Sequence, residues 1–164
     1  MKNVLIRDEE PADIAEIRKL VEETFLQPAE ANLVDRLRAD GDSVISAVAV
    51  DDGHIVGHIM FSSMKAPFRA LGLAPLAVMT SRQRNGIGSQ LIQWGLAQAK
   101  TDGWQAAFVL GDPNFYRRFG FGAALASGFK SQYAGEHFMA VALNGDLPVA
   151  SGKVDYPDAF KMLD

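Results

Sequence analysis

The chain has 164 residues, a length that fits one domain with its own core. Its formal net charge of −4 argues against a general nucleic-acid binder, because such proteins need a basic face to displace counterions from phosphates. It contains no cysteine, which excludes disulfides, thiolate metal sites and a cysteinyl-acyl intermediate. The three histidines lack the spacing of a metal site, so no catalytic metal is expected. No secretory or membrane-spanning run is present in the sequence, so we expect a cytoplasmic protein without a membrane partner.

The first half of the chain predicts a strand, two helices and a hairpin, from apolar periodicity and turn residues. The first helix carries Ile14, Ile17, Val21 and Phe25 on one stripe. The predicted elements are a strand over 4–6, a helix from Pro11 to a break at Gln27-Pro28, a second helix ending at Asp40-Gly41, and a hairpin of strands 44–50 and 55–60.

The second half predicts a strand-helix-strand unit. A looser stretch with Pro67, Gly72 and Pro75 leads into a buried strand over 76–79. A long amphipathic helix follows, and a strand over 106–110 comes next. This order predicts that the two strands are parallel neighbours. Residues 138–143 indicate antiparallel β structure, so the chain is expected to be mixed α/β.

The most informative segment, residues 81–89, lies between a predicted strand and a predicted helix. The helix that begins at Gly86 points unpaired N–H groups and its positive dipole end forward, which makes an anion site suited to a diphosphate. Two other phosphate-binding motifs do not match this segment. A dinucleotide motif needs a glycine where the chain has Leu91, and a P-loop needs a lysine where Ser89 follows Gly88. A glycine-rich turn without a ligand is the alternative interpretation.

The second informative segment is residues 111–121. Asp112 suits an N-cap, Pro113 the first helical position and Gly120 the position just past a helix end. These residues predict a helix of about two turns directly after a buried strand, with Tyr116 in its middle. The alternative role for this tyrosine is that of a half-buried aromatic packed against the core.

Together the two segments resemble the coenzyme A motifs of the GNAT superfamily of N-acetyltransferases. The first matches the pyrophosphate motif Gln/Arg-x-x-Gly-x-Gly/Ala, and the second matches the motif Tyr-x-x-x-Gly-Phe. The matching positions are Gln83, Gly86 and Gly88 in the first segment and Tyr116, Gly120 and Phe121 in the second. Residues 110–121 also look like the corresponding segment of a poorly characterised bacterial subgroup of this family.

The resemblance implies the GNAT fold, a mixed, twisted sheet splayed between its fourth and fifth strands, with helices on both faces. It implies one acetyltransferase domain over residues 1–164, in a family in which homodimers are common. It also implies acetyl-CoA as the acyl donor. The family's coenzyme-binding positions fall here on Leu76, Ala77, Val78, Arg82, Gln83, Arg84, Asn85, Gly86, Ile87, Gly88, Ser89 and Asn114.

In the family, the tyrosine equivalent to Tyr116 protonates the leaving thiolate, a role that suits a phenol with a pKa of about 10. Arg117 and Arg118 either reach the nucleotide phosphates or are solvated surface charges.

The acceptor implied by the family is an amine on a small molecule or a peptide. Without cysteine, direct attack in a ternary complex is favoured over a covalent enzyme intermediate. The general base is not identified: Glu22, Glu23, Glu30 and His58 are candidates, and each has a structural alternative as a solvated helix charge or a packed strand histidine. A non-catalytic sensor that binds acyl-CoA is the alternative function.

Overall fold

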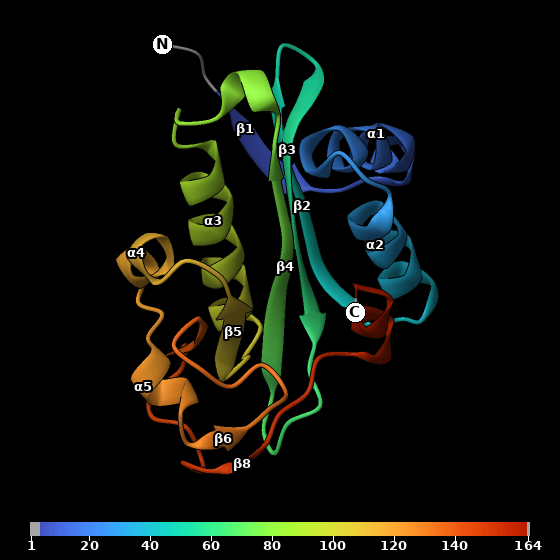
Figure 1. The fold of residues 1–164 in the computed structure, drawn as a ribbon. Coiled ribbons are helices and arrows are strands. Elements are labelled where there is room, and N and C mark those ends of the chain that lie inside the picture. The colour runs from blue at the N-terminus through green and yellow to red at the C-terminus, as the bar shows by residue number, and fades with distance from the viewer. Residues whose placement is uncertain (1–3, 164) are drawn as a thin grey trace.

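A computed structural model describes residues 4–163; the ends of the predicted domain, residues 1–3 and 164, lie outside them (Figure 1). The strands are β1 (Leu5–Asp8), β2 (Ser43–Asp51), β3 (His54–Ser63), β4 (Ala70–Val78), β5 (Ala106–Leu110), β6 (Phe129–Lys130), β7 (Phe138–Ala142) and β8 (Gly152–Lys153). The α-helices are α1 (Ile14–Phe25), α2 (Ala29–Ala39), α3 (Ile87–Thr101), α4 (Pro113–Tyr116) and α5 (Ala123–Ala126). Short 3-10 helices occupy Pro11–Asp13, Thr80–Arg82, Arg117–Phe119 and Asp158–Leu163.

Six strands form one mixed sheet in the order β1-β2-β3-β4-β5-β7. Every neighbouring pair is antiparallel except β4 and β5, which are parallel and joined by α3. The short strands β6 and β8 pair separately. The predicted mixed α/β class, the hairpin and the strand-helix-strand unit are therefore confirmed.

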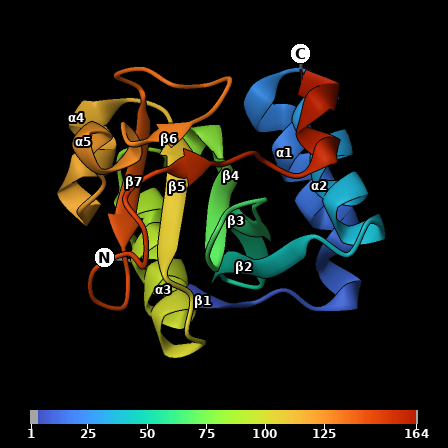
Figure 2. The same ribbon diagram turned by 90° about the horizontal axis from the view of Figure 1, so that it is seen from below.

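Helices cover both faces of the sheet. Helix α3 lies on one face, and α1 and α2 lie on the other, where the C-terminal 3-10 turn joins them (Figures 1 and 2). The amphipathic pattern predicted for this helix is confirmed, because Ile87, Leu91, Gly95 and Ala99, spaced four residues apart, are all buried. The predicted stripe of α1 is partly wrong, since Ile14 is exposed and Leu20 takes its place in the core.

The strand predicted over 76–79 begins much earlier, at Ala70. Proline and glycine residues usually weaken a strand, so the stretch before Leu76 was expected to be loose. The strand tolerates Pro75 because it lies in a bulge, where Ala74 and Pro75 interrupt the pairing with β3 between Leu73 and Leu76. Proline has no backbone N–H to donate to β3, and the bulge lets β4 continue without that hydrogen bond.

Pairing between β4 and β5 is short. Residues 70–72 pair with 106–108, and among the described residues no further ladder joins the two strands. Beyond Gly72 and Phe108 the strands part, as the predicted splay between the fourth and fifth strands requires. The expected parallel pairing is confirmed, but it involves the start of β4 and not residues 76–79.

Among residues 4–163, no helix has both the length and the apolar character that crossing a bilayer requires.

Close packing of α3 on β3 gives a first prediction. A methyl carbon built on Gly95 would lie 2.2 Å from Cε1 of the buried Phe61 ring. Gly95→Ala gains about 1 kcal/mol of helix propensity, but overpacking a core costs about 1–3 kcal/mol. Because 2.2 Å is far inside van der Waals contact, the upper end of this cost applies, and we expect a net loss of about 2 kcal/mol in the free energy of unfolding, measured in urea.

Phe61→Leu provides the control for this clash. Because the smaller side chain leaves room for the added methyl, the double variant should lose less than the sum of the two single losses. An alanine variant as stable as the parent protein would contradict the close packing.

Candidate active site

The start of α3 provides unpaired backbone donors. Gly86 is the N-cap residue and has a φ of 80°, a left-handed conformation that glycine adopts without a steric penalty. Within residues 4–163 no side chain caps this end of the helix, and its first turn holds no acidic residue. The amides at the start of this 15-residue helix are therefore free to bind an anion, which the helix dipole also favours.

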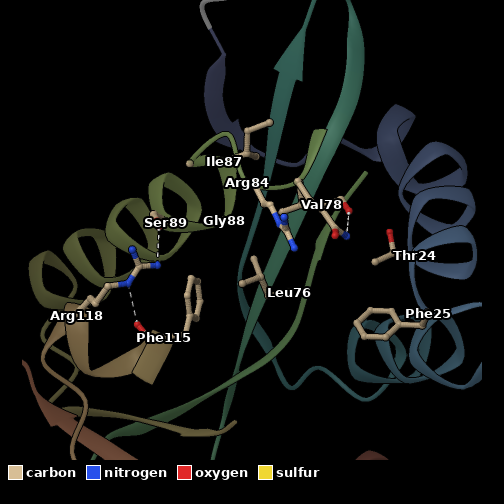
Figure 3. A pocket seen from close by; sticks show the side chains of 12 residues that line it. Thr24, Phe25, Leu76, Val78, Arg84, Ile87, Gly88, Ser89, Phe115 and Arg118 are labelled. Carbon is tan, nitrogen blue, oxygen red and sulfur yellow. Dashed lines mark hydrogen bonds between the residues drawn. The ribbon is translucent and has the colours of Figure 1, made fainter. Parts of the chain in front are cut away.

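A cavity of about 390 Å³ lies directly in front of these amides. Figure 3 shows Leu76 and Val78 of β4 between the end of α1 and the start of α3. The residues that line the cavity are Thr24, Phe25, Leu76, Val78, Gln83, Arg84, Gly86, Ile87, Gly88, Ser89, Phe115 and Arg118. Size and lining are those of a ligand site, with an apolar floor and a few polar groups at one end.

Two arginines give the cavity a positive charge. Arg84 is exposed, has a left-handed φ of 67°, and has neither an ion pair nor a hydrogen bond within residues 4–163. A non-glycine residue in this conformation costs about 1 kcal/mol, which indicates a local constraint. Arg118 stacks on the Phe115 ring at 4.7 Å and has Nη2 within 3.5 Å of the Ser89 hydroxyl oxygen. Both cations border the start of α3.

Arg82 does not face the cavity. Its guanidinium pairs with the carboxylate of Asp51, at the end of β2. The next side chain, Gln83, does line the cavity, and its Nε2 donates a hydrogen bond to the Val78 carbonyl oxygen at 3.1 Å. Arg82, predicted as a coenzyme-binding residue, is thus held by a carboxylate, while Gln83 covers the end of β4.

Tyr116 is positioned by the cap of α4. The Asp112 carboxylate accepts a hydrogen bond from the Asn114 amide at 2.9 Å, as the cap prediction requires. The Tyr116 ring is half-buried and contacts the rings of Phe115 and Phe121 edge-on, at 5.0 and 5.8 Å. Burial raises the pKa of its phenol above the ordinary value of 10. The hydroxyl therefore stays protonated at neutral pH.

The structure brings most of the predicted coenzyme-binding residues together around the cavity. Five of the predicted residues lie outside its lining: Ala77, Arg82, Asn85, Asn114 and Tyr116. Ala77 is buried in the cluster beneath α1, whereas Asn85 and Asn114 have exposed side chains. Of the two neighbouring arginines of the short helix, only Arg118 lines the cavity.

Sequence reasoning missed three lining residues, Thr24, Phe25 and Phe115. Phe25 was assigned to the core stripe of α1, because periodicity shows which face is apolar and not where the helix ends beside a cavity. The hydroxyl oxygen of Thr24 is buried and has no hydrogen-bond partner among the described residues. No local pattern pointed to these positions.

None of the four base candidates lines the cavity. Glu22 pairs with Arg18 at 3.1 Å, Glu30 accepts hydrogen bonds from Gln27, and Glu23 is exposed elsewhere on α1. His58 is fully buried inside the sheet. Among the described residues that line the cavity, only Arg84 and Arg118 have ionisable side chains.

His58 belongs instead to a buried polar network. Its Nε2 lies 2.8 Å from the Ser46 hydroxyl, which donates to Glu9, and Glu9 is held by Arg38 at 2.7 Å. Burial lowers the pKa of His58 to about 4, against the opposing effect of the Glu9 carboxylate. Burial alone would raise the pKa of Glu9, but its hydrogen bonds to Arg38 and Ser46 bring it below the ordinary value. The network links strands and helix without reaching the cavity.

Comparison with known proteins identifies the family. Residues 14–121 match the model of the acetyltransferase (GNAT) family. The chain is 36% identical over 168 aligned residues to YhbS of Escherichia coli K12, described as an uncharacterised N-acetyltransferase, with 96% of this chain and 98% of YhbS covered. The chain therefore belongs to the GNAT family and is an N-acetyltransferase.

Solved structures show the same fold. The crystal structure of E. coli YhbS in complex with CoA has a TM-score of 0.92 and 34% identity, covering 98% of this chain and 93% of that one. A GNAT family acetyltransferase from Brucella melitensis in complex with acetyl-CoA has a TM-score of 0.82 and 37% identity, covering 98% and 99%. The predicted GNAT fold is confirmed.

The buried histidine makes the stability of the fold depend on pH. An unfolded imidazole has an ordinary pKa of about 6.5, whereas His58 titrates near 4 in the folded chain. Between these values only the unfolded chain binds the proton, so stability is complete above pH 6.5 and falls as the pH falls toward 4. We expect His58 to account for a loss of up to about 3 kcal/mol across this window, measured by urea unfolding.

His58→Gln is the control, because it removes the titrating group. The variant should lose less stability than the parent protein between pH 6.5 and 4. Glu9, whose folded pKa is lowered, adds its own loss in both proteins only below about pH 4.5. If the free energy of unfolding changed equally with pH in the parent protein and the variant, His58 would not titrate in this way.

Proposed function

We propose that this enzyme transfers the acetyl group of acetyl-CoA to an amine by direct attack in a ternary complex, and that the chain works as a single domain. One observation carries the proposal: a single cavity joins the uncapped start of α3, two arginines and the edge of β4 that leaves β5. The cavity has anion-binding groups at one end and an unpaired strand edge along its floor. Such a cavity suits a ligand that has a diphosphate and an extended arm with amide groups.

For the donor, we assign the diphosphate to the amides of residues 86–89, together with Arg84 and Arg118. The pantetheine arm would lie along Leu76 and Val78, whose strand has no partner on that side within the described residues. Backbone N–H groups there would hydrogen-bond the arm as an added strand and polarise the thioester carbonyl. The crystal structures of two relatives in complex with CoA and acetyl-CoA support a donor of this class.

For the reaction, the amine nitrogen attacks the thioester carbonyl carbon, the new C–N bond forms and the C–S bond breaks. The departing thiolate takes the phenolic proton of Tyr116. The nitrogen releases one proton, which returns through water to the Tyr116 oxygen, so the enzyme ends in its starting state. The raised pKa of this phenol keeps it protonated before attack.

The acceptor enters as the neutral amine in this scheme. Neither a carboxylate nor an imidazole is found in the described lining of the cavity, and most of the lining is apolar. An apolar site disfavours the charged ammonium form, so deprotonation in water before binding is the simplest route. The rate of acetyl transfer should then rise with pH, up to the pKa of the acceptor amine in solution.

Arg118 and Arg117 give a matched test of the donor site. Arg118 lines the cavity, while Arg117 is exposed outside it. We expect Arg118→Ala to raise the Kd for CoA about tenfold, because it removes one charged partner of the phosphates, and Arg117→Ala to change it less than twofold. Isothermal titration calorimetry at fixed salt measures both. Equal effects of the two substitutions would contradict the assigned phosphate position.

Tyr116→Phe tests the reaction itself. With acetyl-CoA, thiol release is measured against n-butylamine, benzylamine, spermidine, lysine and an alanine-terminated hexapeptide. We expect a saturable rate with at least one amine, and a kcat about 10²-fold lower in the variant with the KM for acetyl-CoA nearly unchanged. CoA binding without thiol release for any amine would instead favour the acyl-CoA-binding sensor. Thiol release without amine dependence would indicate thioester hydrolysis, and an unchanged kcat in the variant would contradict the acid role of Tyr116.

A further inference from the structure

Gly111 lies between the end of β5 and the cap of α4, and the Tyr116 ring packs directly on its backbone. A methyl carbon built on Gly111 would lie 2.6 Å from Cε2 and 3.1 Å from Cδ2 of this ring. Carbon atoms that are not bonded to each other normally stay about 3.5–4.0 Å apart. A side chain at position 111 would therefore push the ring away, and only glycine allows the observed contact.

The backbone at position 111 does not itself require glycine. Gly120, just past the neighbouring 3-10 helix, has a left-handed φ of 95°, which disfavours other residue types. The φ of Gly111 lies outside that region, so it imposes no penalty on alanine. The reason for glycine at this position is the room that it leaves for the Tyr116 ring.

His137, which directly precedes β7, holds both polar groups of the Gly111 backbone. The N–H of Gly111 donates a hydrogen bond to the His137 carbonyl oxygen at 3.0 Å, and the Gly111 carbonyl oxygen lies 3.1 Å from Nδ1 of the His137 ring. A carbonyl oxygen can only accept, so we assign the proton of the imidazole to Nδ1. These bonds follow directly on the Leu110–Phe138 pair of the sheet. The surface under the Tyr116 ring is thus fixed to β7.

Aromatic rings confine Tyr116 on its other sides. The ring centroids of Phe115 and Phe121 lie 5.0 and 5.8 Å from that of Tyr116, and both rings meet it edge-on. Phe121 is buried, and Phe115 lines the cavity. A ring pushed away from Gly111 would have to displace one of these two rings or turn about its own bonds. Either movement shifts the phenolic oxygen at the end of the ring.

We infer that Gly111 is a positioning residue for Tyr116: the missing side chain sets where the phenolic oxygen lies, and the two hydrogen bonds with His137 keep the glycine in place. This inference rests on the proposed function and adds to it two residues outside the cavity lining. A proton donor works only within hydrogen-bonding reach of the atom that it protonates, and a shift of about 1 Å can cost about 10²-fold in rate. Gly111 and His137 themselves transfer no proton.

Gly111→Ala tests the inference, with thiol release measured for the amine of the panel that reacts fastest. We expect kcat to fall about tenfold, because the added methyl displaces the phenol but does not remove it. The Kd for CoA should change less than twofold, since Gly111 does not line the cavity. An unchanged kcat, or a Kd for CoA that rises by as large a factor as kcat falls, would overturn the inference.

The same substitution in the Tyr116→Phe protein separates positioning from packing. Phenylalanine keeps the ring and loses the hydroxyl, so the added methyl meets the same clash in both proteins. We expect Gly111→Ala to lower kcat less than twofold in Tyr116→Phe, because no hydroxyl is left to position. An equal loss in both proteins would overturn the inference and leave the proposed function intact. If Tyr116→Phe alone left kcat unchanged, the acid role of Tyr116 and the inference would both fail.

Gly122→Ala is the matched control. Gly122 has an extended φ of −146°, and among the described residues no atom outside its chain neighbours lies within 4 Å of a methyl carbon built on it. We expect kcat and the melting temperature to stay close to those of the parent protein. A loss of kcat as large as that of Gly111→Ala would overturn the inference, because such a loss would not depend on contact with Tyr116.

His137→Ala is a second variant, which adds no atoms next to the packed ring. The His137 side chain is exposed, so its removal should leave the melting temperature nearly unchanged. It removes one of the two hydrogen bonds on Gly111, and we expect kcat to fall about threefold in the parent protein and to stay unchanged in Tyr116→Phe. An equal effect in the two proteins, or no effect in either, would overturn the inference.

Discussion

The site depends on the early separation of β4 from β5. Three residue pairs hold the strands together, and beyond Gly72 and Phe108 the edge of β4 is left without a strand partner in the described chain. Backbone N–H and C=O groups are obligatory hydrogen-bonding groups, so such an edge must bind water, another strand or a ligand. Because α3 begins just after this strand ends, its unpaired amides lie at the end of the same groove. Opening the sheet thus creates the groove and aligns it with an anion site.

Local charge in the cavity differs from the charge of the protein as a whole. The chain is acidic, with a formal net charge of −4, yet the ionisable side chains in the described lining are arginines. Arg82 is neutralised by Asp51, whereas Arg84 and Arg118 line the cavity and have no carboxylate partner within the described residues. Small anionic ligands respond to such local fields, since the more distant surface charges are screened by salt.

Burial sets the protonation states of three side chains. The Tyr116 and Tyr156 phenols have raised pKa values and the His58 imidazole a lowered one, so all three are neutral at pH 7. In the proposed reaction the neutral Tyr116 phenol protonates the leaving thiolate, whereas the permanently charged arginines of the cavity offer no base to an ammonium group. This arrangement favours an acceptor that arrives already deprotonated.

By itself, the sequence determined the features that depend on neighbouring residues. The apolar ladder of α3, the glycine turn before it, and the cap of α4 by Asp112 and Pro113 are local patterns, and the structure contains each of them. They were sufficient to predict the fold class and most of the cavity lining around α3, because helix periods and caps are set within a few residues.

Only the tertiary structure decided which distant segments meet at the site. Strand β4 extends through Gly72 and Pro75 because β3 accommodates a bulge and because the Tyr156 ring occupies the space above the glycine. Asp51 removes Arg82 from the cavity, and the end of α1 supplies Thr24 to its far wall. These contacts join residues from about 12 to more than 80 positions apart, so no local pattern encodes them. They depend on how the whole chain packs around the sheet.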